Sequence, residues 1–182
     1  EFTQGPVQVT NNPYDLMIQG DGFFAVVGEN DERFYTRDGS FTVNAAGEIQ
    51  NKSGQRLYPG FTVPSNTSNL SVATNGNVDA YISGQVEPAT LGKIPVFVFA
   101  NPVGLKSIGG NLYAQTVGSG EPQEQQAGQG AAGSVQQGAL ESSNVNIMNE
   151  MTNLIKAQRA YEMNSKVMGV GDQMLQTINN VR

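Results

Sequence analysis

SNVNIMNEMTNLIKAQRAYEMNSKVMGVGDQMLQTINNVR, residues 143–182, is an unbroken run without proline at the C-terminal end of the chain. Met, Leu, Ile, Gln and Lys recur in it at helical spacing, which predicts one long helix. At 1.5 Å per residue, residues 144–180 would form a rod of roughly 55 Å, which is longer than a small domain is wide. We therefore expect this helix to find partners outside its own subunit.

Two sets of apolar residues follow different sides of the predicted helix. The first stripe has the seven-residue spacing of a coiled-coil seam, and its members are Ile147, Met151, Leu154, Tyr161, Met168 and Leu175. The second stripe lies nearly opposite at 100° per residue, and its members are Met163, Val167, Val170, Met174, Ile178 and Val181. A helix that is apolar on two sides is expected to be enclosed. The alternative is an ordinary bundle helix whose seam drifts, but we expect no second helix in these 182 residues.

Residues 1–117 are predicted to form an antiparallel β domain. Residues 23–27, 34–37 and 40–43 are strand-like, and turn sequences recur at intervals of roughly 8 to 12 residues. Asn75-Gly76 is the strongest two-residue hairpin signal. Residues 94–100, IPVFVFA, are the most β-prone segment and are expected to form an inner strand.

Residues 118–138, GSGEPQEQQAGQGAAGSVQQG, are of low complexity, and Val135 is their only branched aliphatic residue. Such a segment is expected to be a flexible Gly/Gln-rich linker, because it has little to bury. Residues 139–182 would then be the C-terminal helix. The predicted fold class is mainly β with α: an antiparallel β domain, a low-complexity linker and one long C-terminal helix of coiled-coil type.

The composition excludes several classes of function. Only 14% of residues are charged, against a usual ~25%, and the net charge is −6 with a pI of about 4.5. We expect no nucleic-acid partner, because the basic patch that binds phosphates is missing. We expect no direct membrane insertion, because no apolar run approaches 18 residues. The absence of cysteine and histidine removes thiol chemistry, the commonest general base and the commonest transition-metal ligand.

Three motifs suggest chemistry, and each is better explained as a turn. Residues 20–25, GDGFFA, match a dinucleotide-binding pattern, but a strand follows the glycines where that site needs a helix. Residues 38–44 resemble the start of a calcium loop, but Val43 and Ile49 stand where glycine and glutamate are required. Asp15, Asp21 and Asp38 are candidate glycosidase carboxylates, although such Asp residues are more often turn formers. We predict no catalytic residue, no metal and no cofactor.

Four blocks of the chain resemble the bacterial flagellar rod and hook protein family. They are residues 12–24 (NPYDLMIQGDGFF), 35–41 (YTRDGSF), 139–146 (ALESSNVN) and 158–166 (QRAYEMNSK). The family-motif residues are Asn12, Pro13, Asp15, Gly20, Asp21, Gly22, Phe23, Phe24, Arg37, Gly39, Ser40, Phe41, Asn144, Val145, Asn146, Arg159 and Tyr161. Residues 2–5, 101–105 and 109–113 are most similar to the members that build the distal part of the rod. The glycines of residues 168–171 depart from the family pattern.

The resemblance implies a structural subunit that polymerises with itself into the distal rod, the drive shaft of the flagellum. It implies that this chain contacts proximal rod subunits, hook subunits and bushing-ring proteins, that it lies in the basal body across the periplasm, and that it leaves the cell through the flagellar export channel. It also implies that an N-terminal helix, absent here, pairs with the C-terminal one. The alternatives are a proximal rod or hook subunit of the same family, a secreted β-domain adhesin or carbohydrate-binding module, and a glycosidase.

Overall fold

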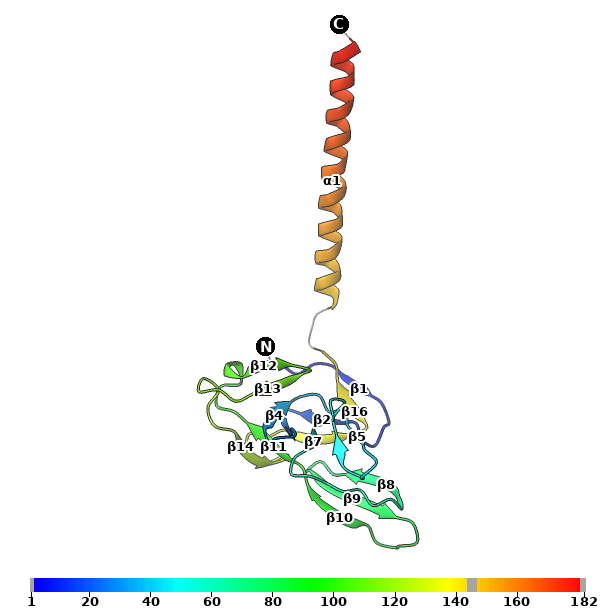
Figure 1. The fold of residues 1–182 in the computed structure, drawn as a ribbon, viewed down its shortest axis with the longest axis vertical. Helices are drawn as coiled ribbons and strands as arrows, with labels where there is room; N and C mark the ends of the chain where they lie inside the picture. The colour runs from blue at the N-terminus through cyan, green and yellow to red at the C-terminus, as the bar shows by residue number, and fades with distance from the viewer. Residues whose placement is uncertain (1, 144–146, 181–182) are drawn as a thin grey trace. The chain divides into compact units, whose positions relative to one another are not determined.

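The computed structural model describes residues 2–143 and 147–180, which fall into two units, Glu1–Asn144 and Val145–Arg182. The first unit is built from short strands and the second is one helix (Figure 1). The elements are β1 (Val7–Val9), β2 (Leu16–Gln19), β3 (Phe24–Val27), β4 (Arg33–Thr36), β5 (Thr42–Val43), β6 (Ile49–Gln50), β7 (Arg56–Leu57), β8 (Thr67–Val72), β9 (Asn77–Ile82), β10 (Ala89–Lys93), β11 (Pro95–Val98), the 3-10 helix η1 (Pro102–Gly104), β12 (Lys106–Gly109), β13 (Leu112–Ala114), β14 (Gln123–Gln126), β15 (Ser134–Gln137), β16 (Ala139–Glu141) and α1 (Ile147–Asn180).

The strands of the first unit pair antiparallel throughout the described residues. The largest sheet has the order β12-β13-β4-β3-β7-β6-β5, and a second sheet has the order β10-β9-β8. Three further pairs join distant parts of the chain: β1 with β16, β2 with β15, and β11 with β14. The predicted mainly β class with one C-terminal helix is thereby confirmed, because antiparallel strands are followed by α1 in the described part of the chain.

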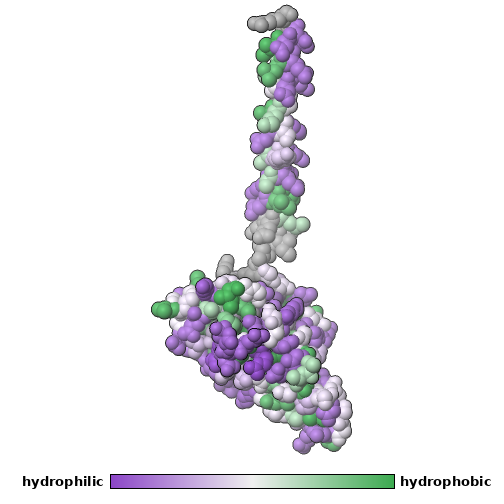
Figure 2. Space-filling model, in the orientation of Figure 1, coloured by the Kyte–Doolittle hydropathy of each residue, from purple (hydrophilic) through white to green (hydrophobic). Residues whose placement is uncertain are grey.

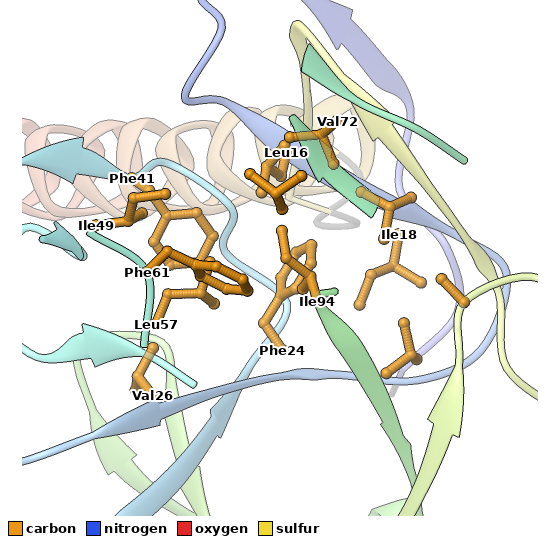
Figure 3. Packing of buried hydrophobic residues seen from close by; sticks show 14 of the residues in the cluster. Leu16, Ile18, Phe24, Val26, Phe41, Ile49, Leu57, Phe61, Val72 and Ile94 are labelled. Carbon is orange, nitrogen blue, oxygen red and sulfur yellow. The ribbon is translucent and has the colours of Figure 1, made fainter. Parts of the chain in front are cut away.

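The main core of the β unit gathers side chains from most of these strands. Figure 3 shows Phe24 and Phe41 among aliphatic residues of this cluster. Their rings pack edge to face, with the ring centroids 5.6 Å apart. A second, aromatic cluster forms around Phe23, Tyr35 and Phe97. The consecutive residues Phe23 and Phe24 thus enter different clusters, because successive side chains of an extended chain point to opposite faces.

Two local predictions are confirmed by the strand pairing. Residues 94–100 contain β11, which pairs with β14 on one side and forms a bridge from Phe97 to Phe23 on the other, so β11 is an inner strand. Asn75-Gly76 lies in the hairpin between β8 and β9. The loop there has three residues rather than two, because Ala73 N donates to Asn77 O at 2.9 Å and Gly76 takes a positive φ of 87°.

The prediction of a flexible linker over residues 118–138 was wrong. This segment contains β14 and β15, and Val135 is fully buried. The Gln137 side chain donates to the carbonyl oxygens of Pro13 and Leu70, both at 2.8 Å, and accepts from Val72 N at 3.0 Å. Neighbouring strands supply the hydrogen bonds that the segment cannot make by itself, so it is part of the β unit.

The predicted helix boundary at residue 139 was also wrong. Residues 139–141 form β16, which pairs with β1 from Val7↔Glu141 to Val9↔Ala139. The helix α1 starts at Ile147 and runs to Asn180 without interruption, including Gly169 and Gly171. Within the described residues, no helix has both the length and the hydropathy needed to cross a membrane.

Candidate functional site

The two predicted stripes of α1 are uncovered in the free subunit. Every described side chain from Met151 to Asn180 is exposed, and apolar side chains recur along the face of the helix seen in Figure 2. Among the stripe residues the exposed fraction runs from 54% at Val170 to 76% at Met168. Ile147 begins α1, but its side chain lies outside the described part of the structure, as does Val181.

Sequence reasoning missed one apolar residue of this surface. Ile155 is 51% exposed and lies between the two stripes. A strict seven-residue repeat includes Leu154 but omits Ile155. The apolar residue type of Ile155, directly after Leu154, was the signal that could have identified it. The apolar surface of α1 is therefore wider than the two stripes.

A second candidate site lies within the β unit, where three of the family blocks meet around Arg37. We call it the Arg37 cluster, and it consists of Arg37, Glu141 and the carbonyl groups of Ile18, Gly20 and Gly22. Arg37 Nη1 donates to Gly20 O and Gly22 O at 2.8 Å each, and Nη2 donates to Ile18 O at 3.4 Å. Arg37 Nε lies 3.0 Å and Nη2 lies 2.8 Å from Glu141 Oε2.

The turn formed by Gly20-Asp21-Gly22 explains why this cluster forms. Gly20 and Gly22 have φ values of 113° and 122°, which glycine adopts without steric cost. A Cβ atom on Gly22 would overlap the side chain of Val96. The glycines therefore let the turn lie against β11 while the carbonyl oxygens of both accept from Arg37. Because β3 follows the turn, the GDGFFA sequence lacks the helix that a dinucleotide site requires.

Glu141 ties both ends of the β unit to the Arg37 cluster. Its Oε2 pairs with Arg37, and its Oε1 accepts from Gly5 N at 2.8 Å. The side chains of Arg37 and Glu141 are only 16% and 12% exposed, so solvent screens the pair weakly. Through Arg37 and Glu141, the last strand of the β unit is thus joined to the glycine turn and to Gly5, which precedes the first strand.

Asp38 and its neighbours form a turn beside this cluster. Asp38 Oδ1 accepts from Ser40 N at 3.0 Å and from Ser40 Oγ at 2.7 Å, and Oδ2 accepts from Asn111 Nδ2 at 3.3 Å. A Cβ atom on Gly39 would overlap the carbonyl oxygen of Leu16, so only glycine fits there. These contacts are those of an Asp that shapes its own turn.

An open cavity of about 350 Å³ lies beside these groups, and Arg37, Asp38, Asn111 and Glu141 contribute to its walls. The carboxylates of Asp38 and Glu141 already accept from protein donors. No cluster of three or more Asp or Glu side chains in the described part of the chain could hold a metal ion. The arrangement holds strands and turns of the β unit together.

The remaining family-motif residues have structural places. Asn12 Oδ1 accepts from Tyr14 N at 3.1 Å, Pro13 O accepts from Gln137, and Asp15 N donates to Asn12 O at 3.1 Å. Arg159 and Tyr161 are exposed on α1. Asn144, Val145 and Asn146 lie outside the described residues.

Glu141 and Gln137 are the structural residues that sequence reasoning did not single out. Glu141 lies inside the block of residues 139–146, but its partner is 104 positions away in the sequence. Gln137 lies in the low-complexity segment, where no signal distinguishes it from the other glutamines.

Comparisons with known proteins place the chain in a family. Residues 136–181 match the family described as flagellar basal body rod FlgEFG protein C-terminal, and residues 17–80 match flagellar hook protein FlgE/F/G D1 domain. The flagellar basal-body rod protein FlgG of Buchnera aphidicola subsp. Acyrthosiphon pisum is 40% identical over 179 residues, which cover 98% of this chain and 69% of the relative. FlgG of Caulobacter vibrioides is 40% identical, covering 98% and 68%, and FlgG of Borreliella burgdorferi is 39% identical, covering 100% and 69%. With the four sequence blocks and the fold, these matches show that the chain belongs to the flagellar basal-body rod protein family and is a structural subunit of the rod.

Proposed function

We propose that this subunit polymerises with copies of itself through the two stripes of α1, and that the polymer is the distal rod. The observation that carries the proposal is the exposure of every described stripe side chain on α1, at 54–76%. Burying an apolar side chain contributes about 1.5–3 kcal/mol. Copies of α1 packed side by side would cover both stripes at once, which one partner helix could not do.

The same packing accounts for the transmission of motor torque. Close-packed side chains have no room to slide past one another without opening voids, so an inner tube of helices resists twisting. The β units are closed by their own cores and would form the outer layer of the shaft.

Family membership supports a proposal for further partners and for the location. We place the subunit in the basal body across the periplasm, after export through the flagellar channel. Its neighbours there are proximal rod subunits, hook subunits and the proteins of the bushing rings.

Substitutions at two adjacent helix positions test the proposal in the full-length gene product. Met174→Asp puts a carboxylate on the second stripe, where burial of an unpaired charge costs several kcal/mol. Gln173→Asp adds the same charge one position earlier, about 100° around the helix and off both stripes. We expect Met174→Asp to abolish polymers in sedimentation and electron microscopy, whereas Gln173→Asp polymerises normally.

The cellular counterpart uses a strain from which the encoding gene is deleted. We expect this strain not to swim and its basal bodies to stop before the distal rod. Met174→Asp should fail to restore swimming, and Gln173→Asp should restore it. Equal behaviour of the two variants, in vitro and in cells, would refute assembly through the stripes.

A further inference from the structure

The methionine side chains that the structure describes divide sharply by exposure. Of the six methionines in the chain, Met17 is fully buried in the β unit, whereas Met151, Met163, Met168 and Met174 on α1 are 58–76% exposed. The side chain of the sixth, Met148, lies outside the described part of the structure. We propose that the thioethers of these four α1 residues are a modification site for two-electron oxidants such as hydrogen peroxide, and that their sulfoxidation lowers self-association of the subunit. The second half of the proposal rests on the proposed function.

The composition directs such an oxidant to methionine. The chain contains no cysteine and no tryptophan, so no thiol or indole competes for the oxidant. In the reaction the lone pair of Sδ attacks one peroxide oxygen, the O–O bond breaks and an S–O bond forms. The sulfur loses two electrons, the transferred oxygen gives up its proton, and the second oxygen takes up a proton and leaves as water. Each modified residue becomes methionine sulfoxide, which is polar and can be reduced enzymatically.

The positions of the four residues connect this chemistry to assembly. Met163 and Met174 are about three helical turns apart on the second stripe, and Met151 and Met168 lie on the first. The stripe neighbours of Met163 and Met174 are Val167, Val170 and Ile178, whose side chains have no hydrogen-bond donor. A sulfoxide oxygen buried among such side chains would lose its hydrogen bonds to water without replacement. Oxidation of Met163 and Met174 therefore acts against burial of the second stripe.

The rate at which these four methionines are oxidised should also show whether the subunit is free or polymerised. In the free subunit the four sulfur-bearing side chains face solvent, whereas packing of the stripes in the polymer would cover them. The four thioethers are therefore expected to be oxidised readily before assembly and slowly after it.

The first measurement maps oxidation in the full-length gene product by peptide mass spectrometry during exposure to hydrogen peroxide. In unassembled protein we expect Met151, Met163, Met168 and Met174 to be oxidised at least about 10-fold faster than Met17, because exposure controls the reaction. Polymerisation should slow the four by a similar factor. Oxidation of Met17 at the same rate in folded protein would overturn the assignment of the site.

The second measurement compares assembly before and after oxidation. We expect oxidation of the four residues to raise the concentration needed for polymerisation by about 10-fold or more, and reduction by methionine sulfoxide reductases to reverse the change. A variant with all four residues changed to Leu keeps the apolar volume and should polymerise without the roughly 10-fold response to peroxide. If that variant fails to assemble, the test rests on the natural sequence. There, polymerisation that does not recover after treatment of the oxidised protein with the reductases would overturn the assembly half of the proposal.

The outcomes separate this proposal from the one on which it rests. Failure of the unoxidised full-length protein to polymerise would overturn the proposed function and the assembly half of the inference, and the mapping would still test the site. Normal polymerisation of fully oxidised protein would overturn the inference alone.

Discussion

The β unit and α1 use the same apolar residue types in opposite ways. In the β unit, side chains such as Phe24, Val26 and Leu57 are completely buried by strands of their own subunit. On α1, Leu154, Met163 and Val167 are 61–71% exposed. The difference teaches that the stability of the β unit is internal, whereas the helix depends on whatever packs against its stripes. Substitutions that affect one region should leave the other unchanged in the free subunit.

The largest expected effect is in the main core. Phe24→Ala removes a fully buried ring that meets Phe41 edge to face, and should lower the free energy of unfolding of the β unit by about 3–5 kcal/mol. The matched change Leu154→Ala on α1 should alter it by less than about 0.5 kcal/mol in unassembled protein. Urea unfolding followed by tyrosine fluorescence measures both, and equal losses would contradict the comparison.

The next effect concerns the Arg37 cluster. Arg37→Met leaves the Glu141 carboxylate and two turn carbonyls without their donor, at an expected cost of about 2–3 kcal/mol. Arg56→Met is the control, because Arg56 is 49% exposed and lies 3.5 Å from Glu48 and 4.0 Å from Asp31. Urea unfolding should show a clear loss in the free energy of unfolding for Arg37→Met and almost none for Arg56→Met.

Gln137 tests whether residues 118–138 belong to the β unit. Gln137→Leu removes three hydrogen bonds to buried or partly buried backbone groups and should cost about 2 kcal/mol. Gln85→Leu, at an exposed loop position, is expected to be neutral. If the segment behaved as a flexible linker in solution, both variants would unfold at the same urea concentration.

Replacement of glycine by alanine should stabilise α1 but destabilise the β unit. Gly171 lies within α1 with open space around its Cβ position, so Gly171→Ala should stabilise the helix of the free subunit by about 1 kcal/mol. Gly22→Ala should destabilise the β unit, because φ is +122° and the added methyl overlaps Val96. Circular dichroism measures the change in helix stability in Gly171→Ala, and urea unfolding measures the change in β-unit stability in Gly22→Ala. A loss of helix stability in Gly171→Ala would show that α1 is already packed against a partner in the free subunit.

The smallest expected effect is a dependence on pH from Tyr35. Burial raises the pKa of the Tyr35 hydroxyl above its ordinary 10.0, and the positive charge of Arg33 opposes this in part. Above pH 10 the unfolded chain therefore loses this proton before the folded chain does, and stability falls as pH rises. Below pH 10 the contribution is fully present. Urea unfolding of Tyr35→Phe should therefore show a smaller decline in stability than the natural sequence as the pH rises past 10.

Much of the fold could be predicted because its signals are local. The heptad spacing predicted α1, the glycine and asparagine turns predicted the hairpins, and IPVFVFA predicted the inner strand β11. Four sequence blocks were enough to indicate the family. The errors came at residues 118–141, where glutamine, glycine and alanine carry little local preference for any structure.

The candidate site was predictable in part, for the same reason. The stripes follow from periodicity along one helix, which the sequence displays directly. The Arg37–Glu141 pair joins residues 104 positions apart, and no local pattern says that β16 returns beside β1.

By itself the sequence determined that a long helix with two apolar sides follows an antiparallel β domain, because helical and strand periods are written in consecutive residues. Only the tertiary structure decided that the Gln-rich segment forms strands of the β unit and that Arg37 binds both Glu141 and the glycine turn. Both depend on hydrogen-bond partners supplied by distant strands, and such partners exist only once the chain has folded.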